Sequence, residues 1–301
     1  MMGVNGVAVD AMPATVQAPR WPAWIHVARQ AFRRRKVVIG GLLLLIMVGS
    51  AIFAPALAPY NPDHQDVASR LQPPVWAGGS ADHLLGTDHL GRDMLSRIMY
   101  GGRVSLLIGF AAVLISGTLG VLLGLLAGFR GGRMDSILMR LADVQLAFPQ
   151  ILLVLLILVI LGRSVGAIVI VLALADWVIY ARLVRGRLLV ERQREYVEAA
   201  QAIGASRWRI MFRHLLPNVA PIIMVIATLQ LGVMILLESS LSYVGVGIEP
   251  PTSSWGRMLN DGQMYMAIAW WVSTLPGVAI VLTVLGVNFL GDGLREALGI
   301  E

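Results

Sequence analysis

Apolar residues along the chain are gathered into long runs that are separated by short polar or arginine-rich links. A helix needs about 20 apolar residues to cross the hydrocarbon core of a bilayer, and its backbone amides must bond within the segment. The pattern therefore predicts an all-α integral membrane protein with six transmembrane helices, at residues 37–57, 104–128, 136–161, 166–183, 219–238 and 270–290.

The first apolar run could instead be a secretory signal peptide, but its length and its flank argue against that interpretation. The run is longer than the usual signal core, and residues 59–62 (Pro-Tyr-Asn-Pro) do not form a small-residue cleavage site. We expect a membrane helix that stays in the mature chain.

Basic residues are unevenly distributed among the links, and this predicts the orientation. Six Lys or Arg residues precede the first run and seven arginines lie within residues 183–218, whereas residues 241–265 contain only Arg257. Because cytoplasmic loops carry the excess of Lys and Arg, both termini and the 183–218 link are expected in the cytoplasm. Trp270 and Trp271 are expected at the outer membrane interface, where indole rings collect.

The same pattern divides the chain into five parts. We expect a partly disordered cytoplasmic tail at 1–36, the first transmembrane helix at 37–57, an extracytoplasmic segment at 58–103, a five-helix core at 104–292 and a cytoplasmic tail at 293–301.

Composition supports a membrane protein. The chain is 57% hydrophobic and only 14% charged, against about 25% charge in soluble proteins. Its net charge of +6 would suit a nucleic-acid partner, but the arginines lie beside apolar runs and are not interleaved with stacking aromatics. The chain has no cysteine, which excludes disulfides and thiolate chemistry.

The second apolar run carries a small residue at every fourth position: Ala112, Ser116, Gly120, Gly124 and Gly128. This spacing keeps all of them on one helix face, where another helix can approach closely. Static packing is favoured over a contact that slides during function, and either interpretation indicates a multi-helix bundle.

The link before the fifth run predicts a helix, a turn and a second helix. Residues 195–203 are good helix formers, Gly204 can end a helix in the left-handed region, and Ser206 can cap the next one. Pro217 is expected to interrupt that helix. Ala199, Ala200 and Ala202 keep the first helix slim, and Trp208, Met211 and Phe212 supply apolar anchors. The chemistry alone fits a helix resting on the lipid surface equally well.

The series Glu198-Ala199-Ala200, Gly204 and Leu216-Pro217 resembles the EAA loop of bacterial ABC-import permeases, with His214 where the general pattern has isoleucine. In that family the loop is the coupling helix that docks into a cleft of an ATPase subunit. The resemblance implies these ATPase-coupling residues: Glu198, Ala199, Ala200, Gly204, Ser206, Trp208, Arg209, Leu216 and Pro217.

The resemblance extends over most of the chain. Residues 83–93, 100–106, 238–247, 250–256 and 288–295 resemble segments of the dipeptide, oligopeptide and nickel import permeases, specifically the second (C-type) subunit. It implies the type I ABC importer permease fold, a homologous second permease, two ABC ATPase subunits and an extracytoplasmic substrate-binding protein, all at the bacterial cytoplasmic membrane. The first 36 residues match no part of the family pattern.

Catalytic motifs are missing. The only lysine, Lys36, is followed by Val37, so no phosphate-binding Gly-x4-Gly-Lys-Ser/Thr motif exists. His-Glu-x-x-His and Gly-x-Ser-x-Gly are also absent. We therefore expect no enzyme, no metal and no cofactor in this chain, and ATP and Mg²⁺ would be bound by the partner ATPase subunits.

Acidic residues near the spans are candidates for a polar translocation path: Asp176, Glu238 and Asp143. Charged groups at membrane depth are costly and tend to face cavities or partners, although interhelical hydrogen bonds explain them as well. Arg140 lies three residues before Asp143 and could pair with it. In the extracytoplasmic segment, Asp88, Arg92 and Asp93 are candidates for docking a binding protein, with a structural ion pair as the favoured alternative.

Together these observations predict the permease subunit of an ATP-driven peptide importer. The same architecture importing nickel or another small solute is the alternative within this class. An ATP-independent channel or secondary transporter remains as a rival class, and a membrane enzyme would need a catalytic cluster that the sequence does not contain.

Overall fold

The computed structural model describes residues 34–299, and this part of the chain contains helices and no β-strand. The helices are α2 (Arg35–Ile52), α3 (Ala54–Leu57), α4 (Met94–Arg130), α5 (Gly132–Leu146), α6 (Gln150–Leu161), α7 (Val165–Glu191), α8 (Glu195–Ala202), α9 (Arg207–Arg209), α10 (Leu216–Tyr243), α11 (Trp255–Gln263) and α12 (Trp271–Ala297). A π-helical turn, Ile210–Leu215, joins α9 to α10. The expected disorder of the N-terminal tail concerns residues 1–33, which lie outside the described residues.

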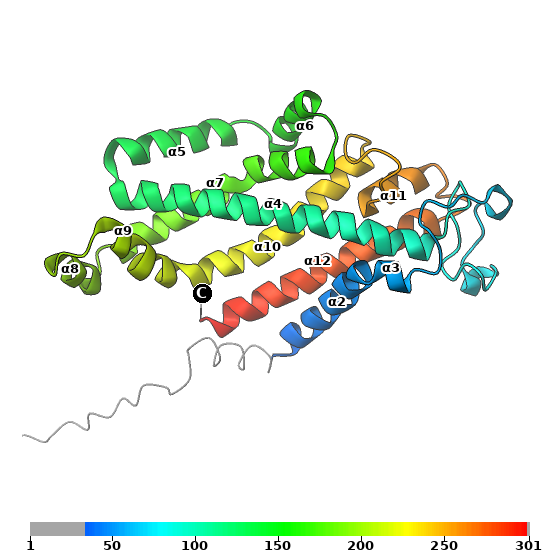
Figure 1. Ribbon diagram of the computed structural model, residues 1–301, viewed down its shortest axis with the longest axis horizontal. Helices are drawn as coiled ribbons and strands as arrows, with labels where there is room; N and C mark the ends of the chain where they lie inside the picture. The colour runs from blue at the N-terminus through cyan, green and yellow to red at the C-terminus, as the bar shows by residue number, and fades with distance from the viewer. Residues whose placement is uncertain (1–33, 300–301) are drawn as a thin grey trace, which may run out of the picture.

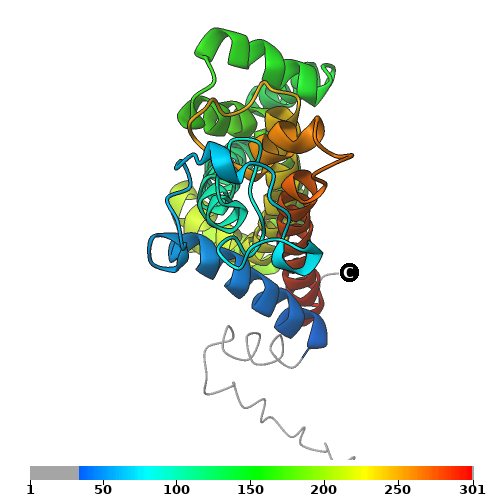
Figure 2. The ribbon, with the colours of Figure 1, turned by 90° about the vertical axis from the view of Figure 1, so that its right-hand side faces the viewer.

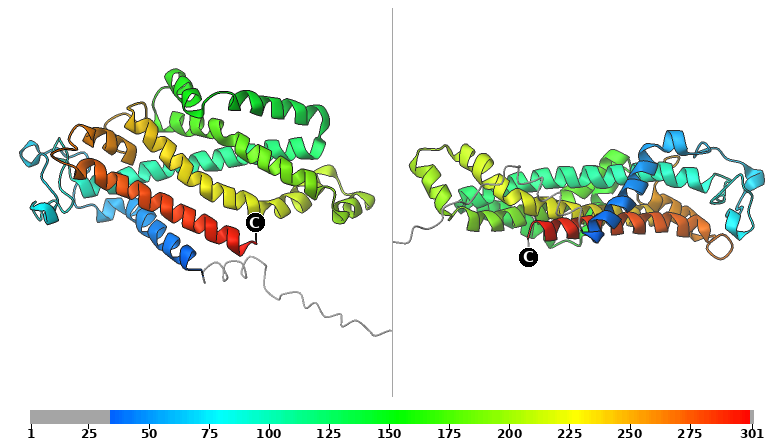
Figure 3. Two further views of the ribbon diagram at one scale, coloured as in Figure 1. Left: turned by 180° about the vertical axis from the view of Figure 1, so that it is seen from behind. Right: turned by 90° about the horizontal axis from the view of Figure 1, so that it is seen from below.

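The long helices form an elongated bundle (Figure 1). The segment between α3 and α4 lies with α11 at one end, and α8 and α9 lie at the opposite end (Figures 1 and 3). Helix α2 crosses the bundle beside α12 (Figure 2). The start of α2 and the end of α12 both point toward the α8 end (Figure 1).

Membrane-spanning length is present in five of the described helical segments, and the α5–α6 pair makes a sixth if it is counted as one broken span. The predicted all-helical membrane fold is therefore confirmed. Several helices run beyond the apolar runs: α4 begins at Met94 and α7 continues to Glu191.

The third predicted span is not one continuous helix. Helices α5 and α6 meet at an angle of 91°, so the prediction of a single helix over 136–161 is wrong. Pro149 has no N–H to donate and disfavours helical geometry at the residue before it, so the chain bends there. The apolar character continues through the bend, and hydropathy alone does not reveal it.

Gln145 holds the end of α5 against α7 just before this bend. Its amide nitrogen donates to the carbonyl oxygens of Leu174 and Ala175 at 3.0 and 2.9 Å, and its oxygen accepts from the Trp177 indole at 2.8 Å. The nitrogen and the oxygen of the Gln145 amide are therefore both hydrogen-bonded to α7. These bonds hold the C-terminal end of α5 in place just before the bend.

The small-residue face of α4 is confirmed as a packing face. Ala112, Ser116, Gly120, Gly124 and Gly128 are all buried, and the three glycines lie against α7. A methyl group on Gly124 would lie 2.6 Å from the carbonyl oxygen of Ala181, and one on Gly120 would lie 2.3 Å from that of Trp177. The two backbones are therefore too close to admit any side chain between them.

This contact predicts opposite effects for two glycine-to-alanine changes. Gly124→Ala should lower the free energy of unfolding by about 1–3 kcal/mol, because the added methyl forces α4 and α7 apart. Gly186→Ala is the matched control on α7, since a methyl there meets nothing within 4 Å. The control should be neutral or up to about 1 kcal/mol more stable through helix propensity. Thermal unfolding in detergent measures both, and equal stability of the two variants would contradict the close-packed interface.

Candidate functional site

The link between α7 and α10 forms the predicted helix, turn and helix. Helix α8 ends before Gly204, whose φ of +76° lies in the left-handed region. The Ser206 hydroxyl accepts from the backbone N–H of Arg209 at 3.3 Å and caps α9. The local geometry inferred from Gly204 and Ser206 is therefore confirmed.

Pro217 does not interrupt the second helix, and that prediction is wrong. Residues 207–243 form one continuous helical segment, in which Pro217 lies in the first turn of α10. The preceding π-helical turn, Ile210–Leu215, has wider hydrogen-bond spacing, and this geometry accommodates a residue that lacks an N–H. One helical segment therefore continues from the surface link into the membrane-spanning part of α10.

One face of the link is anchored in the bundle. A buried cluster joins the link to the ends of α4 and α7: Leu125, Val184, Leu188, Val197, Ala200, Ile210, Met211, Leu215 and Val219. Met211, one of the expected apolar anchors, is only 4% exposed, so it anchors the link to the bundle and is not available to a partner. Ala200 likewise packs inward, and Leu216 is half-buried.

The opposite face of the link is free to meet a partner. Exposed residues here include Glu198, Ala199, Gly204, Ser206, Arg209 and Pro217. Ile203 is 85% exposed, and Trp208 stacks on Phe212 with ring centroids 5.7 Å apart while both remain exposed. Figure 1 shows α8 at the extreme end of the bundle, so this apolar and charged face has no covering element among residues 34–299.

The three acids considered for a path differ in their surroundings. Asp143 is exposed and forms a salt bridge with Arg182 of α7, so the expected partner Arg140 is not the one observed. Asp176 is 1% exposed and accepts from the Gln230 amide at 2.6 Å. Within residues 34–299, neither its second oxygen nor the buried Tyr180 hydroxyl one turn away has a hydrogen-bond partner.

Glu238 is completely buried near the C-terminal end of α10. Its carboxylate accepts from the Ser105 hydroxyl of α4 at 3.0 Å and from the Ser242 hydroxyl at 2.8 Å. Ser105 in turn accepts from the backbone N–H of Trp255 at 3.2 Å. Glu238 thus links α4, α10 and the start of α11. This arrangement agrees with interhelical hydrogen bonding, the alternative to a role in the translocation path.

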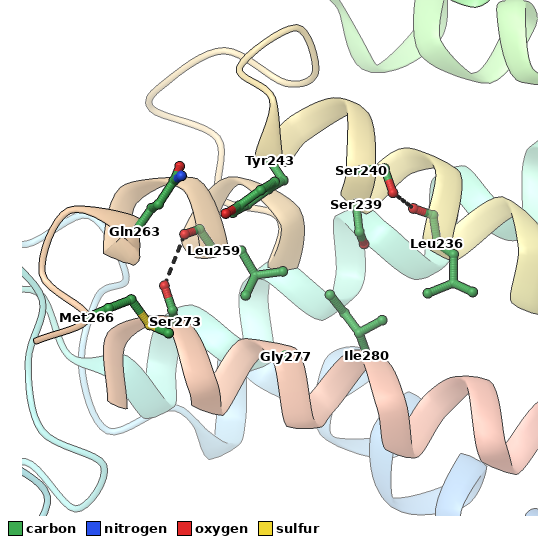
Figure 4. A pocket seen from close by; sticks show the side chains of 10 residues that line it. All are labelled: Leu236, Ser239, Ser240, Tyr243, Leu259, Gln263, Met266, Ser273, Gly277 and Ile280. Carbon is green, nitrogen blue, oxygen red and sulfur yellow. Dashed lines mark hydrogen bonds between the residues drawn. The ribbon is translucent and has the colours of Figure 1, made fainter. Parts of the chain in front are cut away.

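An open cavity of about 440 Å³ lies at this end between α10, α11 and α12 (Figure 4). Most of its lining is apolar, from residues such as Leu236, Leu259 and Ile280, and the Ser239, Ser273 and Tyr243 hydroxyls are at its wall. Sequence reasoning missed this cavity, because its walls come from three consecutive helices whose packing against one another is not specified by any local motif. Glu238, the residue before Ser239, is not part of the lining, and its carboxylate accepts from Ser105 of α4 and from the Ser239 hydroxyl.

The extracytoplasmic candidates belong to a buried ion network. Asp88 accepts from the Arg92 guanidinium at 2.6 Å and from that of Arg97, and Arg97 also reaches Asp261 of α11 at 3.1 Å. Burial alone would raise the pKa of Asp88, but the neighbouring Arg97 and Arg92 hold it below its usual value. Sequence reasoning missed Arg97 and Asp261, which no local motif links.

Asp93 has a structural position as well. It is 2% exposed, caps α4 by accepting from the Ser96 N–H at 2.8 Å, and lies 3.0 Å from the His83 ring. Asp88 and Arg92 are also buried, so the ion-pair alternative fits this cluster better than direct docking. Of the two tryptophans expected at the outer interface, Trp270 is exposed, but Trp271 is buried and donates to the Thr87 carbonyl.

Two family models match the chain. The model described as the inner membrane component of binding-protein-dependent transport systems matches residues 120–299. The N-terminal transmembrane domain of oligopeptide transport permease C matches residues 23–74. The second match includes residues 23–36, so the expectation that the first 36 residues match nothing is wrong for that part.

Curated relatives cover nearly the whole chain. It is 44% identical to the di/tripeptide transport system permease protein DppC of Pseudomonas aeruginosa, over 97% of both chains. It is 42% identical to the glutathione transport system permease protein GsiD of Pectobacterium atrosepticum, over 91% of this chain and 90% of that one. A probable D,D-dipeptide transport system permease protein, DdpC of Escherichia coli, is 40% identical over 87% and 86%.

A solved structure shares the fold. A chain of the inward-facing MetNI methionine ABC transporter superposes with a TM-score of 0.55 at 22% identity, covering 69% of this chain and 98% of that one. The predicted fold class is thereby confirmed for the part of the chain that the superposition covers.

The buried ion network predicts a large stability loss for Asp88→Asn. The change leaves Arg92 and Arg97 buried without this carboxylate, and such a loss costs about 3–5 kcal/mol. Asp63→Asn is the matched control, because Asp63 is exposed in the same segment. Thermal unfolding in detergent at neutral pH compares the two, and equal stability would rule out a structural role for the network.

The same network predicts an acid-labile component of stability. Because the folded-state pKa of Asp88 is lowered, its contribution is full above the ordinary pKa of 3.8 and is lost as the pH falls through the lower folded-state pKa. Unfolding curves recorded from neutral to acid pH should therefore converge for wild type and Asp88→Asn. A constant difference at all pH values would contradict this sign.

Proposed function

The chain belongs to the family of inner membrane components of binding-protein-dependent transport systems, and we propose that it is one permease of an ATP-driven peptide importer. It is a multi-pass protein of the bacterial inner membrane. In the proposed complex it pairs with a homologous permease, and the translocation path lies between the two. Two ABC ATPase subunits bind ATP and Mg²⁺ on the cytoplasmic side, and an extracytoplasmic protein delivers the cargo.

The observation that carries the proposal is the exposed link at the end of the bundle. Its inner face is locked to α4 and α7 by the buried cluster, and its outer face presents Ile203, Trp208 and Phe212 to a partner. An apolar surface of this kind at the end of a bundle fits a groove on another protein. We assign this face, with Glu198 and Arg209 beside it, to the ATPase subunit.

The continuous segment from residue 207 to residue 243 provides a physical route for coupling. A displacement of the link on ATP binding moves α9 and, through the π-helical turn, α10. The far end of α10 carries Glu238 and one wall of the outer cavity. Closure of the ATPases therefore changes the packing of α10 against α4 and α11, and this would switch the side from which the path is open.

Peptides are the proposed cargo, because the relatives named above are permeases for di- and tripeptides, glutathione and D,D-dipeptides. Among the acids proposed for the path, Asp143 exposes its carboxylate in the present arrangement. Asp176 and Glu238 would reach the path only when α10 moves relative to α4 and α7. We propose that any docking of the binding protein uses the surface built on the buried Asp88, Arg92 and Asp93.

The coupling role predicts that Gly204→Pro and Glu198→Arg leave membrane insertion intact and reduce transport. Proline cannot adopt the positive φ of residue 204, so the turn must unwind. Peptide uptake and cargo-stimulated ATPase activity should both fall roughly tenfold or more, which corresponds to about 1.4 kcal/mol of lost coupling. The measurement uses proteoliposomes that contain the whole transporter and its binding protein.

Gly204→Asn is the matched control, because asparagine tolerates the left-handed region, and it should retain most of the activity. Normal uptake and ATPase stimulation in both Gly204→Pro and Glu198→Arg would refute the coupling role.

Asp176 allows a separate test of the path. Asp176→Asn keeps an oxygen that can accept from Gln230, so uptake and stability should stay close to wild type if the residue serves helix packing. Asp176→Leu leaves the buried Gln230 amide without its acceptor and should lower the free energy of unfolding by about 1–3 kcal/mol. A large loss of uptake in Asp176→Asn with unchanged unfolding temperature would instead show that the negative charge acts on the cargo.

A further inference from the structure

A second feature lies beside the link, namely a groove of about 660 Å³ between the ends of α4 and α7 and the helices α8 and α9. Three arginines line it, one from each side: Arg130 at the end of α4, Arg192 after α7, and Arg207 at the start of α9. Its other polar side chains are Gln193, Glu198 and Gln201. The coupling motif does not account for Arg130 or Arg192, which lie outside it.

None of the three arginines forms a salt bridge in the part of the chain that the structure describes. The groove contains one carboxylate, Glu198, and Arg192 also acts electrostatically on Asp135, so positive charge exceeds negative charge in the groove. Arg192 donates to the Gly128 carbonyl at 3.1 Å, which fixes the end of α7 to the end of α4. Other arginines nearby do find acids, as Arg185 does with Asp135.

Helix ends explain only part of this arrangement. Arg130 and Arg192 lie at the C-terminal ends of their helices, where a positive charge is favourable. Arg207 is the first residue of α9, an N-terminal position where the helix dipole disfavours a cation. With Arg207 beside two further arginines and only one carboxylate, Glu198, the groove has an excess of positive charge that can attract an anion.

From these contacts we propose that the groove receives a carboxylate-bearing segment of the ATPase subunit; the inference rests on the proposed function. Guanidinium groups bind carboxylates through paired N–H donors, and several converging arginines select for acidic side chains. The interaction is distinct from the apolar contact of Ile203, Trp208 and Phe212. It adds an electrostatic contact that holds the ATPase against the ends of α4 and α7 as well as against the link.

The surroundings favour a protein partner over a lipid headgroup. The groove shares α8 with the link, at the extreme end of the bundle in Figure 1. The groove and the exposed face of the link therefore lie on the same side of the molecule, where the proposed function places the ATPase subunit.

The sequence offers a direct chemical test, because Lys36 is the only lysine in the chain. In the assembled transporter, Arg207→Lys and Arg130→Lys each place a single new side-chain amine in the groove while keeping the positive charge. A carbodiimide joins an amine to a carboxylate only when the two are in contact. We expect each variant to form a covalent adduct with the ATPase subunit, and mass spectrometry identifies the linked acidic residue.

Arg187→Lys is the matched control, since Arg187 is exposed on α7 outside the groove and should give no such adduct. Charge reversal provides the functional readout. At low salt, the double variant Arg130→Glu/Arg207→Glu should bind the ATPase subunit with about tenfold lower affinity. Arg187→Glu should bind it with wild-type affinity. The wild-type complex should approach the double variant as salt is raised.

The outcomes separate the groove from the proposed function. A wild-type complex that purifies with ATPase but gives no adduct from either groove lysine overturns the inference and leaves the proposed function standing. If the wild-type chain does not bind an ATPase subunit at all, both the inference about the groove and the proposed function are wrong. If the double variant binds ATPase normally but loses a dependence on phosphatidylglycerol in nanodiscs, the groove holds a lipid headgroup and the inference is again wrong.

Discussion

The near-contact of the α4 and α7 backbones is the constraint on which the rest of the structure depends. Water cannot drive helices together in a bilayer, so close van der Waals packing must do so, and small residues permit it. Gly120, Gly124 and Gly128 bring α4 against the stretch of α7 from Trp177 to Leu188. At the end of this contact, Leu125, Val184 and Leu188 form the floor on which the link packs. The position of the link is therefore determined by the same interface that holds the bundle together.

The packing of the link against α4 and α7 affects α10 as well, because the link continues directly into that helix. Had Pro217 broken the helix, a push on α9 would have been absorbed by a hinge at the membrane surface. The π-helical turn instead keeps residues 207–243 as one helical segment. At the outer end, Glu238 ties that segment to Ser105 of α4, whose hydroxyl also accepts from Trp255 of α11. A displacement at one end is thus opposed by specific polar contacts at the other.

Local patterns predicted much of this from the sequence, and the failures have physical causes. Periodicity identified the small-residue face, and Gly204 and Ser206 identified the turn, because each depends on residues close in sequence. The break at Pro149 was missed because the apolar run continues through it, and the continuous helix at Pro217 because a π-helical turn compensates nearby. Asp143 pairs with Arg182 and not with Arg140, because α7 packs beside α5 and brings Arg182 to it. Asp88 and Asp261 share arginines although they lie far apart along the chain.

The two ends of the bundle treat charge in opposite ways, and this contrast carries functional meaning. At one end, Asp88 and Asp261 accompany Arg92 and Arg97, so buried charges are compensated within the chain and fix the segment between α3 and α4 to α11. At the other end, three exposed arginines, Arg130, Arg192 and Arg207, line one groove with a single carboxylate, Glu198, and neither Arg130 nor Arg207 forms a salt bridge among residues 34–299. These arginines give the groove more positive than negative charge. Their charge is best understood as one half of an interface, with the neutralising half on another subunit.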